Sequence, residues 1–349
     1  MAAANLPAAF TPGAPPLRHT APVARTFAAA LAAVTLLVAL AALLGHTARG
    51  DGPAAPAVAG GEDPAAASAA GAPGDAGATT GDEPPALATC GLPHDPGDFV
   101  RAIARPEGDR AYRLHVPAGY GDTPRALVLN FHGYARTAAE QEEYSGLVPL
   151  SDREGFVLVT PEGSGSPQGW DIPGIYADIG VDDTAFAAAL IDDVAASLCI
   201  DPARIFATGM SNGGQMAALL GCAYPGLIAA VAPVAGLAVD ACAHPVPLIT
   251  FEGSDDWNVE PWLVEETFAL WGPANGCDPT PREELVSESV LHRWFEGCAG
   301  NDAGLYFVLG GGHTWPGATP GASSGAGATT AEINASELIW AFFAAHPLP

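Results

Sequence analysis

Residues 208–215 read Thr-Gly-Met-Ser-Asn-Gly-Gly-Gln, between an apolar run at 205–207 and a helix-forming stretch at 216–220. A G-x-S-x-G sequence that follows a strand and opens a helix is typical of a sharp turn that lifts a serine hydroxyl clear of a sheet. The glycines allow backbone angles that a Cβ would obstruct, and they let strand and helix approach closely. The stretch therefore predicts a strand–turn–helix unit with Ser211 as a candidate nucleophile.

On both sides of this turn, apolar runs of strand length alternate with amphipathic stretches of helix length. This pattern predicts an α/β fold, in which a mainly parallel central sheet carries helices on both faces. The strands are expected at 112–116, 126–131, 156–160, 205–209, 229–234, 248–251 and 305–309. The helices are expected at 138–153, 182–198, 213–222, 262–270 and 333–345. Ligands bind such open sheets at the carboxyl ends of the strands, so we expect the site there.

The first quarter of the chain differs from the rest. Residues 1–46 are expected to be a signal peptide or an uncleaved signal anchor, because 27–44 form an apolar run broken only by Thr35. Ala57-Val58-Ala59 is a candidate cleavage site. Residues 47–89 are rich in Ala, Gly and Pro and are expected to be a disordered linker. The folded domain is predicted at 90–349, which is long enough for a sizeable core.

The chain is strongly acidic, with a formal net charge of −26 and 13 basic residues that are all arginine. Such a surface repels phosphate backbones, so nucleic acid is excluded as an expected partner. We interpret the acidity as an aid to solubility outside the cell rather than as a docking surface. The only membrane contact expected is through an uncleaved N-terminal anchor, and the domain is expected to be a monomer.

All six cysteines lie in the predicted domain, at positions 90, 199, 222, 242, 277 and 298. An even set behind an export signal indicates disulfide bonds and an extracellular location. Cys277 and Cys298 are the expected pair, because both lie in a polar insertion before the last predicted strand. The other four cysteines allow three pairings, which the sequence leaves open. No C-x-x-C or clustered histidine spacing supports a metal site.

A serine hydroxyl needs a base within hydrogen-bonding reach, and the base needs an acid that orients it. On this kind of fold the acid and then the histidine follow the serine in sequence. Three histidines qualify by position: His292, His313 and His346. We predict His313 as the base, because residues 310–317 read Gly-Gly-Gly-His-Thr-Trp-Pro-Gly directly after the last strand. His292 is expected inside a charged helical insertion, and His346 lies in the C-terminal tail.

The acid is expected in residues 252–256, Glu-Gly-Ser-Asp-Asp, which follow a predicted strand. Asp255 and Asp256 compete for this role. The other aspartate is expected to cap the helix that begins near Pro261 or to form an Asx-turn.

Negative charge on a carbonyl oxygen needs preorganised N–H donors. We expect one from the backbone of Asn212, directly after the serine, and another from Tyr134, in the stretch Leu-Asn-Phe-His-Gly-Tyr at 129–134. The alternative for that stretch is an ordinary tight turn.

Aromatic residues gather in loops after the predicted strands. Trp170, Trp257 and Trp315, together with His132, are the candidate substrate-binding residues. The alternative for each tryptophan is packing in the core.

With these residues assembled, the chain resembles the polyhydroxybutyrate depolymerase and feruloyl esterase family of secreted α/β-hydrolases. The matching stretches are 129–134, 152–157, 201–204, 209–214 and 312–317. The resemblance implies an extracellular serine esterase that uses Ser211, His313 and an aspartate. The family usually has His-Gly-x-x-Asp in the acid loop, so the pattern assigns Asp256 as the acid and marks Glu252 as a departure. Asn212 fits the feruloyl and acetyl esterase-like branch better than the dedicated polymer depolymerases.

The leading hypothesis is a secreted carboxylic ester hydrolase that needs neither metal nor cofactor. The expected substrates are esters, polymeric ones included: polyhydroxybutyrate-type polyesters or oligomers, or feruloyl and acetyl esters of plant polysaccharide. Two alternatives stay open, a non-catalytic binding module on the same fold and a serine peptidase.

Overall fold

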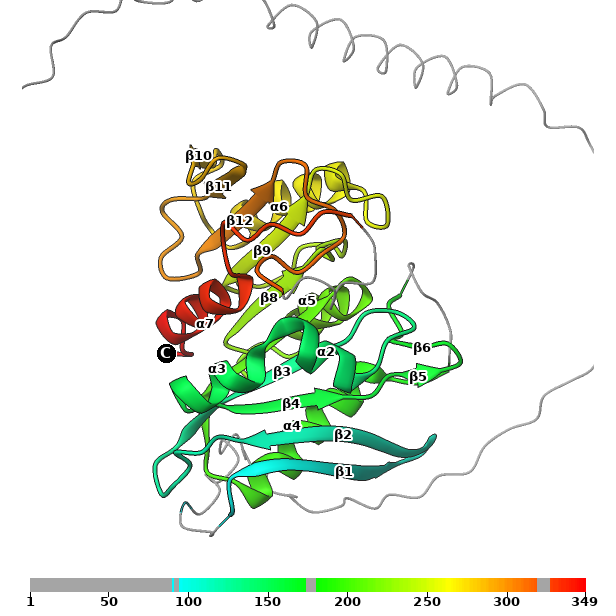
Figure 1. Ribbon diagram of the computed structural model, residues 1–349. Helices are drawn as coiled ribbons and strands as arrows, with labels where there is room; N and C mark the ends of the chain where they lie inside the picture. Colours follow the sequence, from blue (N-terminus) through cyan, green and yellow to red (C-terminus); the bar gives the residue numbers. More distant parts are fainter. Residues whose placement is uncertain (1–89, 91–93, 174–179, 319–326) are drawn as a thin grey trace, which may run out of the picture. The chain divides into compact units, whose positions relative to one another are not determined.

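A large β-sheet forms the centre of the fold (Figure 1). A computed structural model describes residues 90, 94–173, 180–318 and 327–349. Among these residues the sheet has ten strands in the order β1-β2-β4-β3-β7-β8-β9-β12-β11-β10. Its strands are β1 (Gly97–Arg105), β2 (Gly108–Val116), β3 (Arg125–Phe131), β4 (Val157–Pro161), β7 (Ile200–Met210), β8 (Ala230–Val234), β9 (Leu248–Gly253), β10 (Arg282–Leu285), β11 (Val290–Trp294) and β12 (Ala303–Val308). A separate two-stranded sheet pairs β5 (Ser164–Gly165) with β6 (Gln168–Gly169).

The six central strands, from β4 to β12 in the sheet order, are mutually parallel. The outer strands are antiparallel: β1 and β2 at one end, and β11 and β10 at the other. Central parallel strands are covered on both faces, and β4, β8 and β9 are accordingly buried along their whole length. The predicted fold class, an α/β-hydrolase fold with a mainly parallel sheet, is therefore confirmed.

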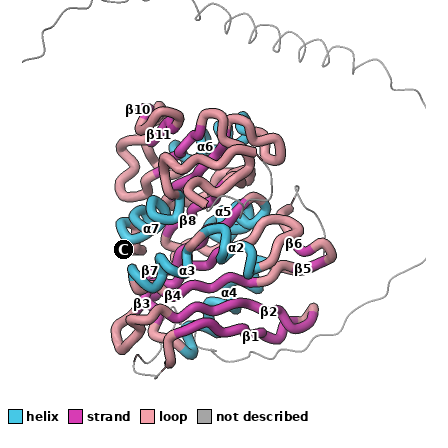
Figure 2. The backbone as a smooth tube through the Cα atoms, in the orientation of Figure 1, coloured by secondary structure: helices cyan, strands magenta, loops and turns pink. Residues whose placement is uncertain are grey.

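Helices cover both faces of the sheet, as Figure 2 shows. They are α2 (Ala138–Ser145), α3 (Leu147–Glu154), α4 (Asp183–Ser197), α5 (Asn212–Ala223), α6 (Pro261–Ala274) and α7 (Ala335–Ala345). The core divides accordingly: α4, α5 and α6 pack in one cluster, and α2, α3 and α7 pack in the other. In β3, Leu127 and Leu129 enter the first cluster and Val128 the second, as the alternation of side chains along a strand requires.

The prediction of a single helix at 138–153 is wrong, because this stretch forms two helices, α2 and α3. Thr137 caps α2 with its hydroxyl, and Glu140 returns the bond in a capping box. The helix ends at Gly146, whose φ of 65° is left-handed, and α3 begins on its other side. Glycine reaches that conformation without steric cost, so the break lies at this residue.

The prediction of a helical insertion around His292 is also wrong. The insertion contains the hairpin of β10 and β11, which extends the sheet beyond β12. Arg293 on β11 pairs across the strands with Glu283 on β10 and also contacts Glu265 on α6. These charges therefore belong to an exposed sheet edge. The sequence analysis also missed β1, which runs antiparallel to β2 at the opposite edge.

Three disulfide bonds join all six cysteines. The predicted pair Cys277–Cys298 is confirmed. The pairing that the sequence left open is Cys90–Cys199 and Cys222–Cys242.

The predicted signal segment 1–46, the linker 47–89 and the candidate cleavage site lie outside the described residues. Within the part of the chain that is described, no helix combines the length and apolarity that crossing a membrane requires. The same part holds no cluster of three or more His, Cys, Asp or Glu side chains arranged to bind a metal ion.

Candidate active site

Ser211 occupies a strained turn between β7 and α5. Its φ of 57° and ψ of −122° are unusual for a residue with a side chain, and its N–H donates to Val234 O on β8 at 2.8 Å. Such angles persist only where the surroundings hold them, and they cluster at functional sites. Gly213 is required next to the turn, because an added Cβ would lie 2.5 Å from His132 O. Ser211 is partly exposed, whereas Met210 and Asn212 on either side are buried.

Asp256 and His313 form a buried acid–base pair. Asp256 Oδ2 lies 2.6 Å from His313 Nδ1, while Asp256 Oδ1 accepts the N–H groups of Asn258 and Val259 at 2.8 and 3.0 Å. Burial acts to raise the pKa of Asp256, but the hydrogen bond and charge of His313 and the two amides outweigh it, so the pKa is lowered. The carboxylate is thus held ionised, with one oxygen directed at the imidazole.

The competing aspartate, Asp255, is exposed and accepts a hydrogen bond from Ser254 Oγ at 3.0 Å. The sequence analysis expected the aspartate that is not the acid to cap the helix near Pro261 or to form an Asx-turn. The N-cap of α6 is instead Glu260, and the Asx-type turn is made by Asp256, through the amides of Asn258 and Val259. That part of the prediction is wrong. One carboxylate both closes the turn and contacts the histidine.

The loop that carries His313 is packed onto the loop that carries Asp256. Asp255 N donates to Gly311 O at 2.8 Å. At Gly253 an added Cβ would lie 2.6 Å from Gly312 O, so only glycine allows the loops to meet this closely. The glycines before His313 therefore let two chain segments share one small space.

The sheet order places Ser211, Asp256 and His313 at the carboxyl ends of neighbouring central strands. β7, β8, β9 and β12 are adjacent and parallel, and Ser211, Asp256 and His313 each follow the carboxyl end of one of them. Among the described residues no hydrogen bond joins Ser211 Oγ to the His313 ring. Catalytic hydrogen bonds are often long before substrate binds and tighten in the complex.

The loop after β3 lies against the serine turn and is anchored by His132, which is fully buried. His132 Nδ1 lies 2.8 Å from Gly133 O, and its Nε2 accepts the N–H of Gly163 at 2.8 Å. The ring is thus neutral, with its proton on Nδ1, and burial lowers the pKa of His132 further. An added Cβ on Gly133 would lie 3.5 Å from Ser211 Cβ, which measures how close the loop comes to the serine.

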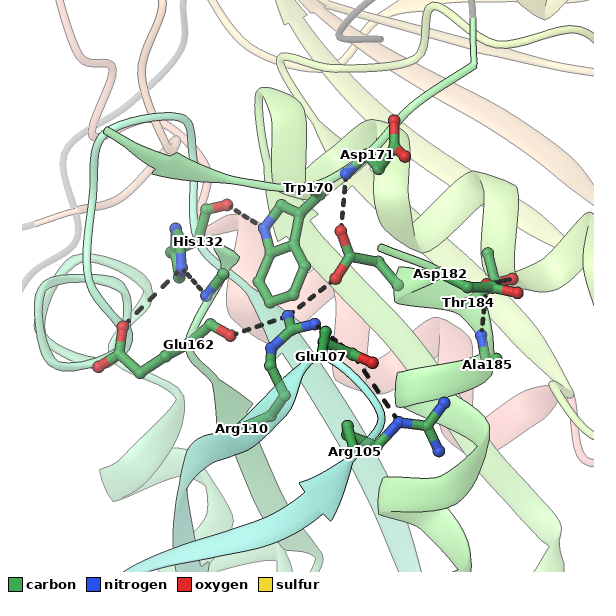
Figure 3. A network of polar contacts seen from close by, with 12 residues as sticks. Arg105, Glu107, Arg110, His132, Glu162, Trp170, Asp171, Asp182, Thr184 and Ala185 are labelled. Atoms are coloured by element: carbon green, nitrogen blue, oxygen red, sulfur yellow. Dashed lines mark hydrogen bonds and ion pairs between the residues drawn. The ribbon is translucent and has the colours of Figure 1, made fainter. Parts of the chain in front are cut away.

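Trp170 joins this loop to α5. The Asn212 side chain accepts the N–H of Trp170 at 2.7 Å and donates to its carbonyl at 3.2 Å, so it binds both polar groups of one residue. The Trp170 indole N–H donates to His132 O at 2.8 Å, as Figure 3 shows. Trp170 is 1% exposed, so the structure does not support the predicted substrate contact and gives it a bracing role.

A buried ion pair supports the segment around Trp170 (Figure 3). Arg110 Nη2 lies 2.8 Å from Asp183 Oδ1, and Asp183 Oδ2 accepts the N–H of Asp171 at 2.7 Å. Burial raises the pKa of Asp183 despite these partners, and the Arg110 guanidinium also stacks over Phe186 at 4.0 Å. The sequence analysis missed this pair, because Arg110 and Asp183 lie 73 positions apart in the chain.

The other predicted substrate-binding residues divide by exposure. Trp315 is 1% exposed, and its indole N–H donates to Ser336 Oγ at 3.0 Å, so it is a core residue in place of the predicted substrate contact. His132 is likewise buried, as described above. Trp257, directly after Asp256, is 70% exposed and is the predicted aromatic residue that presents its ring to solvent beside the site. Tyr134 is 45% exposed.

The chain was compared with known proteins. A family model described as esterase PHB depolymerase matches residues 110–247. "Putative esterase NocK" of Nocardia uniformis subsp. tsuyamanensis is 31% identical over 268 residues, which cover 65% of this chain and 77% of that protein. "Feruloyl esterase B" of Piromyces equi is 29% identical over 228 residues, which cover 57% of this chain but 42% of that protein. Among solved structures, an acetyl xylan esterase from Aspergillus awamori matches with a TM-score of 0.52 at 19% identity, covering 62% of this chain and 94% of the other, a likeness of fold.

Proposed function

This chain belongs to the esterase PHB depolymerase family and is a serine carboxylic ester hydrolase, and from that premise we propose that Ser211 is its nucleophile, His313 its general base and Asp256 the acid that orients the imidazole. The observation that carries the proposal is the 2.6 Å contact between Asp256 and His313, at the sheet edge where Ser211 is held in a strained turn. That arrangement matches the roles that a serine hydrolase requires.

The reaction proceeds in two halves. His313 Nε2 takes the proton of the Ser211 hydroxyl as the oxygen attacks the ester carbonyl, and the resulting imidazolium then protonates the leaving alkoxide. Water attacks the acyl-enzyme with His313 again as base, and Ser211 is released. Asp256 keeps the proton on Nδ1, so that Nε2 is the acceptor, and it stabilises the transient positive charge.

Two backbone donors receive the oxyanion in this proposal. Asn212 is the first residue of α5, where N–H groups have no partner within the helix. The second donor is the N–H of Tyr134. It belongs to the same planar peptide as Gly133 O, which His132 binds from one side, so the N–H points to the other side. His132 and the Asn212–Trp170 brace thereby position the donors rather than touch the substrate.

The proposed substrates are esters of two kinds, polyhydroxybutyrate-type polyesters or oligomers and feruloyl or acetyl esters of plant polysaccharide. Support comes from the family described for PHB depolymerase and from the relative named feruloyl esterase. Trp257 is the proposed aromatic contact for such substrates. We further propose an extracellular location and a monomeric enzyme, consistent with three disulfides and a formal net charge of −26.

The test uses the full chain and short-chain nitrophenyl esters. Replacing Ser211 with Ala is expected to lower kcat by roughly 10⁴-fold or more with an unchanged melting temperature. The matched control is Ser197→Ala, at the end of α4 near the amino end of β7, which should retain full activity. An equally active Ser211→Ala enzyme would exclude the proposed nucleophile. Release of soluble products from polyhydroxybutyrate and from feruloylated or acetylated xylan then separates the two substrate classes, and a peptide amide tests for peptidase activity.

A further inference from the structure

A second carboxyl group lies buried beside the proposed triad acid. Glu252 lies near the carboxyl end of β9 and is 2% exposed. Its Oε1 accepts the N–H of Gly253 at 3.1 Å, but its buried Oε2 has no hydrogen-bond donor among the described residues. An ionised oxygen left without a donor in the interior is strongly destabilising. The proton state of Glu252 therefore needs an explanation.

The neighbouring carboxyl group of Asp256 explains the proton state of Glu252. Asp256 lies across a tight turn from Glu252, because Asp256 N donates to Gly253 O at 3.2 Å, and the charge of Asp256 acts to raise the pKa of Glu252. Two adjacent carboxylates do not both ionise readily, and the one with more donors keeps its charge. Asp256 has three donors, from His313 and the amides of Asn258 and Val259, whereas Glu252 has one. The proton therefore resides on Glu252, and its hydroxyl becomes the donor in the pair.

We propose that Glu252 is a positioning residue for the acid–base pair, in which its protonated carboxyl group donates a hydrogen bond to the Asp256 carboxylate. The proposal rests on the function proposed above, because it takes Asp256 as the triad acid. It gives the orphaned Oε2 a partner without any added group. A carboxylic acid kept neutral by an apolar site can serve as a hydrogen-bond donor at neutral pH, as known enzyme sites show.

The surroundings of Glu252 favour the neutral form. Burial and the charge of Asp256 raise the pKa of Glu252 to about 10. Phe307 of β12 is its partner in register, and α6, on the same face of the sheet, presents Val264 and Phe268. Within the described residues Asp256 is the charged group that acts on Glu252, and His313 lies beyond it.

The proposed hydrogen bond limits the motion of Asp256. Without it, the carboxylate is held by the loop amides and by the histidine that it must itself orient. The fourth donor fixes Asp256 against β9, a strand of the central sheet. Sites built on strands are held more rigidly than sites on loops, so loss of this contact should lower kcat while KM changes little.

The test compares Glu252→Gln with Glu252→Ala in the full chain, with Glu284→Gln on the exposed strand β10 as the control. Gln keeps a neutral donor and an acceptor for Gly253 N, so it should retain kcat within about threefold, whereas Ala should lower kcat by about 10- to 100-fold. The acid limb of the kcat/KM profile should stay at the same pH in Glu252→Gln. A shift of that limb to lower pH would show that a negative charge had been removed, and would overturn the proposal.

Stability gives a readout that does not depend on activity. The pKa of Glu252 has its ordinary value of 4.5 in the unfolded chain and is raised to about 10 in the folded chain. Between these values the folded state binds more protons, so this residue makes the free energy of unfolding fall as pH rises. Glu252→Gln lacks the effect, and its melting temperature relative to wild type should increase from pH 5 to pH 9. A difference that does not vary with pH would contradict the protonated state.

The outcomes separate the inference from the function on which it rests. If Ser211→Ala is inactive while Glu252→Gln and Glu252→Ala have equal kcat, the esterase mechanism stands and the positioning role is wrong. If Ser211→Ala is fully active, the proposed mechanism is wrong whatever the Glu252 variants do, but the melting experiment still decides whether Glu252 carries a proton.

Discussion

Around Ser211 the loops contact one another through neutral hydrogen bonds, and the Arg110–Asp183 ion pair lies behind them. Across the sheet, the loops after β9 and β12 contact one another through carboxyl groups and an imidazole. We call the first region the oxyanion side, formed by His132, Gly133, Trp170 and Asn212, with bonds between amide, indole and neutral imidazole groups. The second is the acid–base side, formed by Glu252, Asp256 and His313.

The difference concerns how each region responds to pH and to substitution. Groups on the oxyanion side carry no charge to gain or lose near neutral pH, and burial keeps His132 neutral. Groups on the acid–base side exchange or share protons as part of their proposed work. Variants on the oxyanion side should therefore have effects that are constant with pH, and variants on the acid–base side should change the pH profile itself.

The largest effect after loss of the nucleophile is expected at His313. Replacing His313 with Asn removes the proposed base, and kcat should fall by roughly 10³- to 10⁴-fold. The remaining activity should lose its decline toward acid pH, because no imidazole remains to be protonated. His346→Asn, at the end of α7, is the matched control. An acid limb that persists in His313→Asn would assign the titration to another group.

A smaller effect is expected from Gly213→Ala on the oxyanion side. The added methyl would overlap Phe131 and His132 carbonyls and push the loop after β3 away from α5. Displacing one oxyanion donor typically costs about 10²- to 10³-fold in kcat. The loss should be the same at pH 6 and pH 9. Gly119→Ala is the control, because nothing lies within 4 Å of its added Cβ. A loss that varies with pH would break the distinction between the two sides.

The smallest of these effects is expected from Asn212→Ala. The substitution keeps the backbone N–H but removes both side-chain bonds to Trp170. Two hydrogen bonds of about 1 kcal/mol each correspond to a kcat loss of about 10- to 30-fold if the brace positions the donors. Trp170 fluorescence should report its release from the loop. Normal kcat with altered fluorescence would show that the brace serves stability alone.

The serine turn and the loop of His313 could be located from the sequence, because both carry local signals. The strand, turn and helix around Ser211 and the glycine-rich loop of His313 follow rules that act over a few residues. The sequence favoured Asp256 over Asp255 only through the resemblance, and the structure shows why spacing alone did not distinguish them. Asp256 makes the Asx-type turn that was assigned to its neighbour, since its two oxygens act separately.

The oxyanion side was harder to predict, because its contacts join distant segments. Trp170 forms hydrogen bonds with His132 and Asn212, which lie 38 and 42 positions away in the sequence. No local sequence pattern predicts contacts between such distant residues. An aromatic residue in a loop after a strand suggests a ligand contact, yet burial turned Trp170 and Trp315 into core residues. The β10–β11 hairpin was missed for a related reason: its exposed charged strands lack the apolar alternation on which strand prediction depends.

The Cys90–Cys199 disulfide has a mechanical consequence. It closes a covalent loop across 109 positions, from the start of the described domain to the residue directly before β7. Strand β1 is the edge of the sheet, and it would be the first to peel if tension entered the chain there. Tension applied to the chain before Cys90 passes instead through the disulfide to the amino end of β7, which is a central strand of the sheet. The disulfide thus shields the edge strand from load and directs the force along β7, the strand that ends directly before Ser211.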